Sequence, residues 1–500
     1  MSFSFDVTWW QAALTALDFL IKVLAVGFVP EGRRPSSSTA WLLAILLLPF
    51  IGLPLFLLMG SPYINQRRHR IQQQANAMIE DVQADFPDVP SNDVSTEALS
   101  IARLNRTLTG FPSVIGHNAG VHADYEQAIQ RMAELIDDAE KHVYVEIYIM
   151  AWDDTTDVFF QALARARTRG VQVKVLFDQI GSYKYPHYRT LGKRLDAIDV
   201  DWRLMLPIQP WNYRFRRPDL RNHRKLVSID GRTAFVGSIN LIERSYRKAW
   251  VNDSPLRWVD YMVELTGPIV SSVEAVFAVD WYIESDEQID VTEPIDAPTT
   301  PHTNYLQMVP SGPGYSTEPV LRVYNSIVHH AKKKLILCSP YFIPDESLLE
   351  SVTSASYRGV EVELYVSRKA DQFMVHHAQS SYYQALLEAG VRIFQFPEPY
   401  ILHSKFTLAD PDDASPAGSG ANSSGNALGT FGSANMDMRS FGLNYETTIL
   451  VSRGDILADL NELAANYKRV CHELTLEEWN KRGFIRRYVD NVMRLTSALQ

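Results

Sequence analysis

The sequence predicts an α/β protein of two similar halves, each a mixed β-sheet flanked by helices, packed as a pseudo-dimer behind a transmembrane helical hairpin. Three observations support this fold class. Strand-like and helix-like segments alternate twice in the same order, one polar motif occurs once in each repeat, and an uncharged apolar run precedes both. Strands that alternate with helices are typical of a mixed or parallel sheet that helices cover on both faces.

Two apolar segments begin the chain. Residues 9–29 are largely apolar and carry Asp18 and Lys22, whose spacing of four lets them pair on one helical face. Residues 40–59 are uncharged and long enough to cross a bilayer core of roughly 30 Å, although prolines and a glycine interrupt them. We therefore expect transmembrane helices at 9–29 and 40–60. A buried core helix is the alternative for the second.

Basic residues flank the second apolar segment on both sides. Three arginines follow it closely and two precede it. Because positive charge is retained on the cytoplasmic side of a membrane, this small excess slightly favours a cytoplasmic catalytic part. We expect a multi-pass protein of the cell membrane.

The chain divides into four regions. A membrane region at 1–62 and a polar connector at 63–117 precede two halves at 118–290 and 303–500, with a proline-rich linker between the halves. Matching elements recur in the same order, which indicates an internal duplication. They are a helix, two strands and the polar motif, at 125–141, 143–149, 170–178 and His223, then at 321–331, 335–343, 359–366 and His403.

The polar motif places a His and a Lys two residues apart, with an Asp five residues after the Lys. The two copies are His223, Lys225 and Asp230, and His403, Lys405 and Asp410. Both copies lie in strand-like segments, where residues i and i+2 share a face, so each His and Lys should point at one site. An imidazole can attack phosphorus or protonate a leaving oxygen, and an ammonium suits phosphate oxygens. The Asp is expected to bond one imidazole nitrogen and fix which nitrogen is free.

Each copy is followed by a Gly-Ser-x-Asn sequence and then by a carboxylate in an apolar strand. The hydroxyls and amides are candidate donors to phosphate oxygens; they belong to Ser238, Asn240, Ser433 and Asn435. The carboxylates, Asp260 and Glu446, occupy equivalent positions and are expected to contact a catalytic His or Lys. A carboxylate that simply faces solvent is the alternative.

The doubled H-x-K-x4-D pattern resembles the phospholipase D superfamily. Displacement at phosphorus needs a nucleophile and an acid, and two copies supply both. The resemblance implies ping-pong transfer through a phosphohistidine, with His223 as nucleophile and His403 as acid and base. It also implies that the lysines and asparagines clamp the phosphate, that Asp230 and Asp410 orient the imidazoles, and that no cofactor or metal is needed.

The N-terminal region narrows the resemblance. The stretch Arg34-Pro35-Ser36-Ser37 with Thr39-Ala40-Trp41, and the following Pro-Phe-Ile-Gly-Leu-Pro, resemble the membrane region of bacterial cardiolipin synthases. The implied reaction joins two phosphatidylglycerols into cardiolipin and glycerol, with the bilayer as partner and a homo-oligomer as an open possibility. The insertion at 411–430, rich in Gly, Ser, Ala and Asn, departs from the family pattern and is expected to be a surface loop.

Other functions stay open at this stage. A phospholipase D hydrolase would use the same residues with water as acceptor. A nuclease is disfavoured by a net charge of −10 and by the absence of a long basic groove, so no nucleic-acid partner is expected. A non-enzymatic scaffold is disfavoured because both motifs are intact. Two cysteines, Cys338 and Cys471, form no disulfide framework.

The C-terminal tail from Ile456 has helical, amphipathic periodicity. It ends in a basic cluster with aromatic neighbours, formed by Lys481, Arg482, Arg486 and Arg487 with Trp479, Phe484 and Tyr488. This pattern fits either an anionic lipid surface or a solvated helix face.

Overall fold

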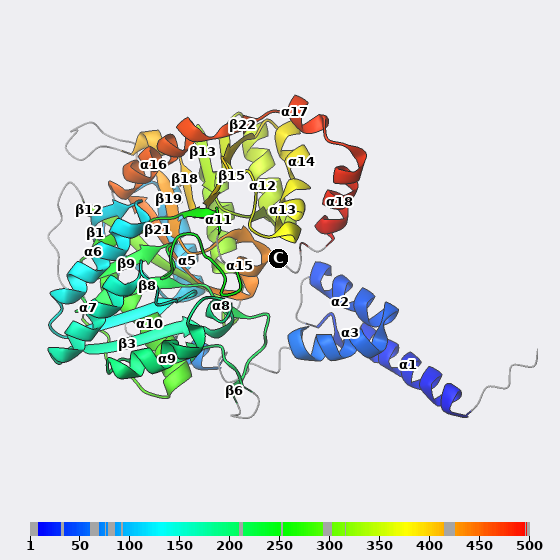
Figure 1. Ribbon diagram of the computed structural model, residues 1–500. Coiled ribbons are helices and arrows are strands. Elements are labelled where there is room, and N and C mark those ends of the chain that lie inside the picture. Colours follow the sequence, from blue (N-terminus) through cyan, green and yellow to red (C-terminus); the bar gives the residue numbers. More distant parts are fainter. Residues whose placement is uncertain are drawn as a thin grey trace, which may run out of the picture. The chain divides into compact units, whose positions relative to one another are not determined.

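The computed structural model describes residues 9–31, 35–60, 70–75, 77–78, 86–91, 94–209, 214–251, 254–293, 303–315, 317–414, 426–495 and 497. Two compact units are present (Figure 1). One comprises residues 1–66 with 216–219, and the other comprises residues 67–215 with 220–500. Residues 294–302 of the expected linker at 289–302, and most of the 411–430 insertion, lie outside the described residues.

The N-terminal unit is helical. Helix α1 (Trp9–Phe28) has 20 residues, which at 1.5 Å per residue span about 30 Å, and most of its apolar side chains are exposed. The expected pair is present, with Lys22 Nζ 2.8 Å from Asp18 Oδ2. Within the described part of the chain, α1 is the helix whose length and apolar composition suffice to cross a membrane.

The single helix expected at 40–60 is wrong. Three short elements take its place, namely α2 (Pro35–Leu47), α3 (Pro49–Leu55) and a π-helical turn (Phe56–Gly60). The chain breaks at Leu48 because Pro49, the first residue of α3, disfavours a helical conformation in the residue before it. A Cβ on Gly52 would lie 2.5 Å from the backbone oxygen of Ala44, so α3 turns back closely onto α2.

The larger unit contains one long hydrogen-bonded sheet that both halves of the chain build. The order of its main path is β22-β16-β15-β13-β18-β19-β21-β12-β1-β11-β9-β8-β2-β3-β4. First-half strands are β1 (Ser113–His122), β2 (His142–Ile147), β3 (Gln172–Asp178), β4 (Asp201–Met205), β8 (Lys225–Ile229), β9 (Thr233–Gly237) and β11 (Met262–Thr266). Second-half strands are β12 (Thr303–Ser311), β13 (Lys334–Cys338), β15 (Glu361–Ser367), β16 (Arg392–Phe396), β18 (Phe406–Ala409), β19 (Leu428–Gly432), β21 (Asn444–Arg453) and β22 (His472–Leu474).

The strand order is mirrored about the antiparallel β1–β12 pair. Moving outward from it, β11, β9, β8, β2, β3 and β4 correspond to β21, β19, β18, β13, β15 and β16. In Figure 1 the first-half strands β3, β8 and β9 lie below the second-half strands β13, β15, β18 and β19. The predicted α/β class and the predicted duplication are confirmed.

Helices cover the sheet. Those of the first half and its approach are α5 (Thr96–Thr109), α6 (Tyr125–Asp137), α7 (Asp157–Thr168), α8 (Gln179–Ser182), α9 (Tyr188–Ala197) and α10 (Ile269–Ser285). Those of the second half are α11 (Pro319–His330), α12 (Glu346–Tyr357), α13 (Phe373–Ser380), α14 (Tyr383–Glu388), α15 (Met438–Gly442), α16 (Ile456–Val470), α17 (Leu476–Asn480) and α18 (Phe484–Arg494).

Alternate residues of a strand enter different cores. In β8, Leu226 packs in the core that contains α10, whereas Val227 packs in the core that contains α6 and α7. The core on the α10 side also includes Phe406 and Ile449 of the second half, so the two halves share it. Strands buried on both faces by helices are what the near-continuous apolar runs of the sequence predict.

Short strands carry segments of one half across to the other. Residues of β7 (Arg221–Asn222) pair in parallel with the start of β21, and β17 (Tyr400–Leu402) pairs in parallel with β10 (Arg257–Val259). These crossings decide where both motif histidines lie, because each His directly follows one of the crossing strands. The remaining short strands are β5 (Ile208–Gln209), β6 (Arg214–Phe215), β14 (Phe342–Ile343) and β20 (Met436–Asp437).

Candidate active site

The two motif histidines meet at the junction of the halves. Their ring centroids are 6.5 Å apart, and both side chains are largely buried. The crossing strands fix this placement, because the backbone N–H of His223 donates to the oxygen of Tyr445 and that of His403 donates to the oxygen of Val259, both at 2.8 Å. The prediction that the two copies form one site agrees with this geometry.

Each histidine is paired with a carboxylate of the opposite half. Nδ1 of His223 lies 3.0 Å from Oε2 of Glu446, and Nδ1 of His403 lies 2.7 Å from Oδ1 of Asp260. A carboxylate accepts, so it selects the tautomer with the proton on Nδ1 and leaves Nε2 with a lone pair. The contacts expected of Asp260 and Glu446 are therefore present, and they cross between the halves.

The two carboxylates differ in their other partners. Glu446 also accepts from the hydroxyls of Ser433, at 2.6 Å, and Ser440, at 2.8 Å. Burial opposes ionisation of Glu446, but the nearby His223 and Lys225 and the Ser433 hydrogen bond outweigh it and lower its pKa. Burial likewise opposes ionisation of Asp260, and His403 lowers its pKa overall. Both carboxylates are thus ionised at neutral pH.

Burial sets the protonation of the imidazoles. It lowers the pKa of His223 to about 4 and that of His403 to about 3, and the carboxylates only partly oppose the shift. Both rings are consequently neutral near pH 7, with Nε2 able to act as a nucleophile or a base.

The two lysines lie at the same centre and are fully buried. Lys225 Nζ donates to the backbone oxygen of His223 at 2.7 Å, and Lys405 Nζ donates to that of His403. Desolvation lowers the pKa of Lys225 to about 7, with Lys405 adding repulsion, and lowers that of Lys405 to about 8. Two ionised carboxylates, two neutral imidazoles and two lysines with lowered pKa values therefore meet in one buried centre.

The expected role of the motif aspartates is wrong. Asp230 accepts hydrogen bonds from the backbone N–H groups of Glu140, Lys141 and His142 at 2.7–2.9 Å. Asp410 accepts from the N–H groups of the equivalent turn, those of Lys332, Lys333 and Lys334.

The length of the strand explains the difference. Asp230 lies seven residues beyond His223, and at about 3.3 Å per residue this corresponds to roughly 23 Å of extended chain. The aspartate therefore fastens the far end of the motif strand to the turn before β2, and the orienting role falls to Asp260 and Glu446.

The Gly-Ser-x-Asn side chains already have partners. Asn240 Nδ2 donates to Tyr246 Oη at 2.9 Å, and Asn435 Nδ2 donates to Asp437 Oδ2 at 3.0 Å. The Ser433 hydroxyl bonds Glu446, and the Ser238 hydroxyl accepts from the N–H of Tyr261 at 3.2 Å. The serines thus hydrogen-bond the strands that carry the carboxylates. Phosphate binding by the two serines and the two asparagines stays a prediction.

The glycine of this sequence permits a close approach of strands. A Cβ at Gly432 would lie 2.2 Å from the oxygen of Thr447, and one at Gly237 would lie 2.4 Å from the oxygen of Tyr261. Thr447 and Tyr261 directly follow Glu446 and Asp260. Because the two glycines have no side chain, the strand that carries each carboxylate can lie next to the Ser-x-Asn segment.

Two tyrosines contact the histidines and were not singled out in the sequence. The ring of Tyr148 lies edge-on to His223 with centroids 4.9 Å apart, and Tyr246 lies 6.4 Å from His403. Tyr246 also receives the hydrogen bond of Asn240. Tyr148 directly follows β2, and Tyr246 lies six residues after Asn240. These positions are the sequence features that could have identified the two tyrosines as candidates.

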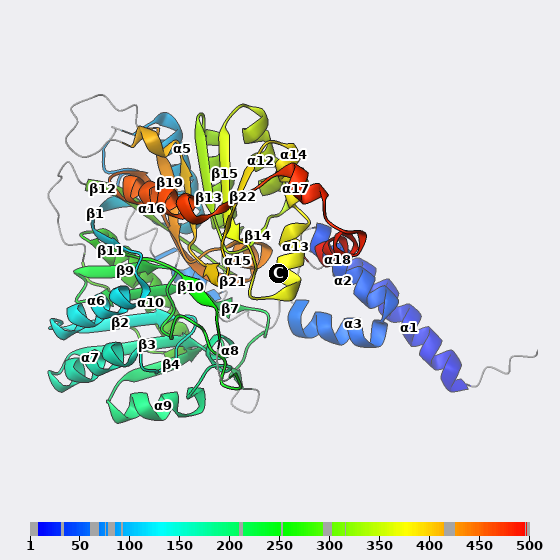
Figure 2. The same ribbon diagram turned by 45° about the horizontal axis from the view of Figure 1, so that its top comes forward.

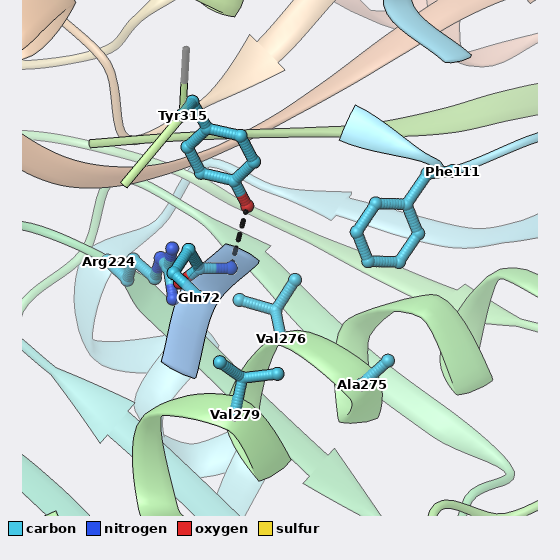
Figure 3. Close-up of a pocket in the computed structure, with 7 residues that line it drawn as sticks. All are labelled: Gln72, Phe111, Arg224, Ala275, Val276, Val279 and Tyr315. Carbon is cyan, nitrogen blue, oxygen red and sulfur yellow. Dashed lines mark hydrogen bonds between the residues drawn. The ribbon is translucent and has the colours of Figure 1, made fainter. Parts of the chain in front are cut away.

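A small cavity lies behind the first motif (Figure 3). It is lined by Gln72, Phe111, Arg224, Ala275, Val276, Val279 and Tyr315. Its volume of about 10 Å³ suits at most one water molecule and excludes a lipid. Arg224, the middle residue of the motif, is buried there and paired with Asp280, so it points away from the catalytic centre, as the strand alternation predicts.

No cluster of three or more metal-ligating side chains occurs in the part of the chain that the structure describes. Both cysteines, Cys338 and Cys471, are free thiols.

The chain matches family profiles over most of its length. A profile described as "Cardiolipin synthase, PLD-like domain" matches residues 132–281 and 324–468, one match in each half. A second, described as "Phospholipase_D-nuclease N-terminal", matches residues 19–60.

Individual relatives agree with these profiles. The chain is 30% identical to cardiolipin synthase A of Proteus mirabilis over 97% of this chain and 98% of that protein. It is 30% identical to cardiolipin synthase A of Wigglesworthia glossinidia brevipalpis over 96% and 95%. The crystal structure of a phosphatidylserine synthase from Haemophilus influenzae covers 80% of this chain and 100% of its own, with a TM-score of 0.55 and 14% identity, and so shares its fold. The chain belongs to the cardiolipin synthase family of phospholipase D-like proteins.

Proposed function

We propose that the protein transfers a phosphatidyl group from one phosphatidylglycerol to another, giving cardiolipin and glycerol through a phosphohistidine. The observation that carries the proposal is the pair of buried imidazoles, each with Nδ1 held by an ionised carboxylate of the opposite half. The relatives named cardiolipin synthase A supply the substrate class.

In the first step, Nε2 of His223 attacks the donor phosphorus. The bond from phosphorus to the glycerol headgroup breaks, and the departing glycerol oxygen takes a proton from Nε2 of His403. In the second step, His403 removes a proton from the terminal hydroxyl of a second phosphatidylglycerol. That oxygen attacks phosphorus and releases Nε2 of His223, so atoms and protons balance over the cycle.

The negative charge of the bound phosphodiester favours protonation of His403 by solvent. In the empty site His403 is neutral, because burial holds its pKa at about 3. A phosphodiester anion placed between the rings stabilises an imidazolium, so His403 gains its proton as substrate binds. Asp260 then stabilises the charged ring, while Lys225 and Lys405 hold the non-bridging oxygens as charge develops. The two asparagines are proposed to add donors there.

We place the protein at the cell membrane, with α1 as a spanning helix and the α2–α3 pair within the bilayer. A cytoplasmic catalytic part is proposed from the arginine excess after the second apolar segment. The shortness of α2 and α3 is consistent with a re-entrant pair as well as with two passes.

Incubation of the purified, detergent-solubilised protein with phosphatidylglycerol and a metal chelator, followed by lipid mass analysis, tests the proposal. Cardiolipin with free glycerol is the expected product. Phosphatidic acid with glycerol would identify a hydrolase, and loss of activity on chelation would contradict the metal-free mechanism. His223→Ala and His403→Ala should each abolish transfer while the melting temperature stays unchanged, and substantial turnover in either variant would refute the two-histidine mechanism.

A further inference from the structure

Helix α18 turns its apolar side outward. Its buried residue is Asp490, which bonds Nδ1 of His377 at 2.7 Å and Nη1 of Arg482 at 2.8 Å. The large apolar side chains of the helix and its end are exposed, with Phe484 at 74%, Ile485 at 78% and Leu495 at 84%. A surface helix of a soluble domain normally buries this side, so the exposed side of α18 calls for an apolar partner.

The exposed apolar residues form one stripe. At 100° per residue, they fall within an arc of about 100°, which is the width of a helix face that packs on an apolar phase; they are Phe484, Ile485, Tyr488, Val492 and Leu495. Helix α13 lies beside α18 in both views (Figure 2) and adds exposed Phe373 and Met374. We call these seven residues the α13–α18 stripe.

Positive charge borders the stripe. Arg487 and Arg494 follow one flank of α18, and Lys481, which pairs with Glu477 at 2.8 Å, precedes the helix. Arg486 Nη2 lies 3.4 Å from Nε2 of His376 on α13. Burial lowers the pKa of His376 to about 4, so this histidine is neutral at pH 7 and adds no charge beside the arginine. An apolar stripe with arginines at its borders is complementary to a bilayer with anionic headgroups.

A chain of contacts connects the stripe to the catalytic centre. From His403, ring contacts lead to Tyr246, at 6.4 Å, and then to Tyr185, at 6.2 Å. Lys184 Nζ lies 5.4 Å from the Tyr185 ring, and its charge interacts with Asp371, two residues before α13 begins. These contacts join the catalytic centre to the segment that directly precedes α13.

We propose that the α13–α18 stripe is a second membrane contact, separate from the N-terminal helices, which inserts into a bilayer containing anionic phospholipid and delivers lipid substrate to the site. The substrate part of this inference rests on the proposed function. The membrane contact does not, and the two are tested by different measurements.

Spin-label accessibility tests the membrane contact on the full-length protein. Ile485→Cys is labelled in a Cys471→Ser background, since Cys338 is buried and Cys471 is partly exposed. The protein is reconstituted in phosphatidylcholine alone or mixed with phosphatidylglycerol. Tyr357→Cys, at an aromatic position of α12 that is 74% exposed, is the matched control. The expected result is high accessibility to oxygen and low accessibility to a polar nickel complex at position 485 in the mixed bilayer, with the opposite at position 357.

Other outcomes overturn the inference. Nickel accessibility at position 485 equal to that of the control would show a solvated stripe. Low accessibility to both reagents would show that protein covers it, either a second copy or the N-terminal helices. Equal immersion in both bilayers would overturn the requirement for anionic lipid.

Turnover tests the delivery of substrate. Phe484→Asp with Ile485→Asp should lower kcat/KM on long-chain phosphatidylglycerol in vesicles by at least about tenfold, while turnover of a short-chain, monomeric phosphatidylglycerol stays unchanged. Tyr357→Asp should change neither. An equal loss on both substrates would overturn the inference. If the unmodified protein turns over neither lipid, the proposed function fails, whereas the accessibility result still decides the membrane contact.

Discussion

Nδ1 of His403 lies 2.7 Å from Oδ1 of Asp260, a carboxylate that belongs to the other half of the chain. The same exchange joins His223 to Glu446. Each half therefore supplies the histidine of one pair and the carboxylate of the other pair. Different effects are expected when Asp260 and Asp230 are each replaced, although both are aspartates of the first half.

Asp260→Asn is expected to lower kcat by about 10²- to 10⁴-fold with little loss of stability, because an amide no longer fixes the Nδ1–H tautomer or stabilises the imidazolium. Steady-state kinetics and thermal unfolding check this. Asp230→Asn is the matched variant, since it changes a motif carboxylate that lies far from the rings. It should lower the melting temperature, because it weakens three backbone hydrogen bonds, and leave kcat of the folded protein within a few-fold. The reverse pattern would restore the aspartate as the orienting group.

The pH dependence of kcat/KM should show a basic limb near neutrality. Burial lowers the pKa of Lys225 to about 7 and that of Lys405 to about 8, so both ammonium groups lose their protons as pH rises through 7–8, and phosphodiester binding weakens. A bound anion raises both pKa values, so the limb in kcat should lie at higher pH than the limb in kcat/KM. A kcat/KM that stays constant up to pH 10 would show that the lysines keep their ordinary pKa.

Lys225→Met is expected to abolish transfer and yet to raise the melting temperature by about 2–4 °C at pH 7. The lysine is fully buried beside Lys405, and its pKa is lower in the folded than in the unfolded chain, so folding releases protons and the wild type gains stability as pH rises from 7 to 10. The difference between variant and wild type should therefore shrink over that range in calorimetric scans. A variant that melts below the wild type at pH 7 would mean that the hydrogen bond to the His223 oxygen outweighs the burial of charge.

Gly432→Ala is expected to destabilise the protein by about 1–3 kcal/mol, because the added methyl group meets the oxygen of Thr447 and the strand cannot move without displacing Glu446. Activity should fall with it, through misplacement of His223. Gly442→Ala is the control, because a Cβ there has no neighbour within 4 Å. Chemical denaturation measures both. Equal stability of the two variants would contradict a packing role for Gly432.

The local part of the site could be predicted from the sequence, whereas its assembly could not. The motif spacing identified His223 and Lys225 as one pair, although His223 lies between β7 and β8 and not within a strand. The equivalence of Asp260 and Glu446 follows from the repeat. Local spacing says nothing about which half a carboxylate serves, because that depends on the crossing of β7 and β17 into the opposite half. Motif spacing suggested that Asp230 orients the ring, although the length of the strand places it out of reach.

The membrane region shows the same limit. The uncharged, apolar composition of residues 40–60 predicts a helical segment, and helical elements do occupy these residues. The break at Leu48, however, depends on one proline and on the close contact of Gly52 with Ala44, which hydropathy does not encode.

The exchanged strands also constrain how the protein can evolve. A gene for one half would encode a histidine without its carboxylate and a carboxylate without its histidine, so an ancestral single-copy protein had to associate with itself to act. After fusion, the exchange ties the fates of the two copies together. If Glu446 is replaced, another carboxylate can take over its role only if it lies beside His223, more than two hundred residues away in the sequence. Neither half can therefore lose its motif while the other stays active.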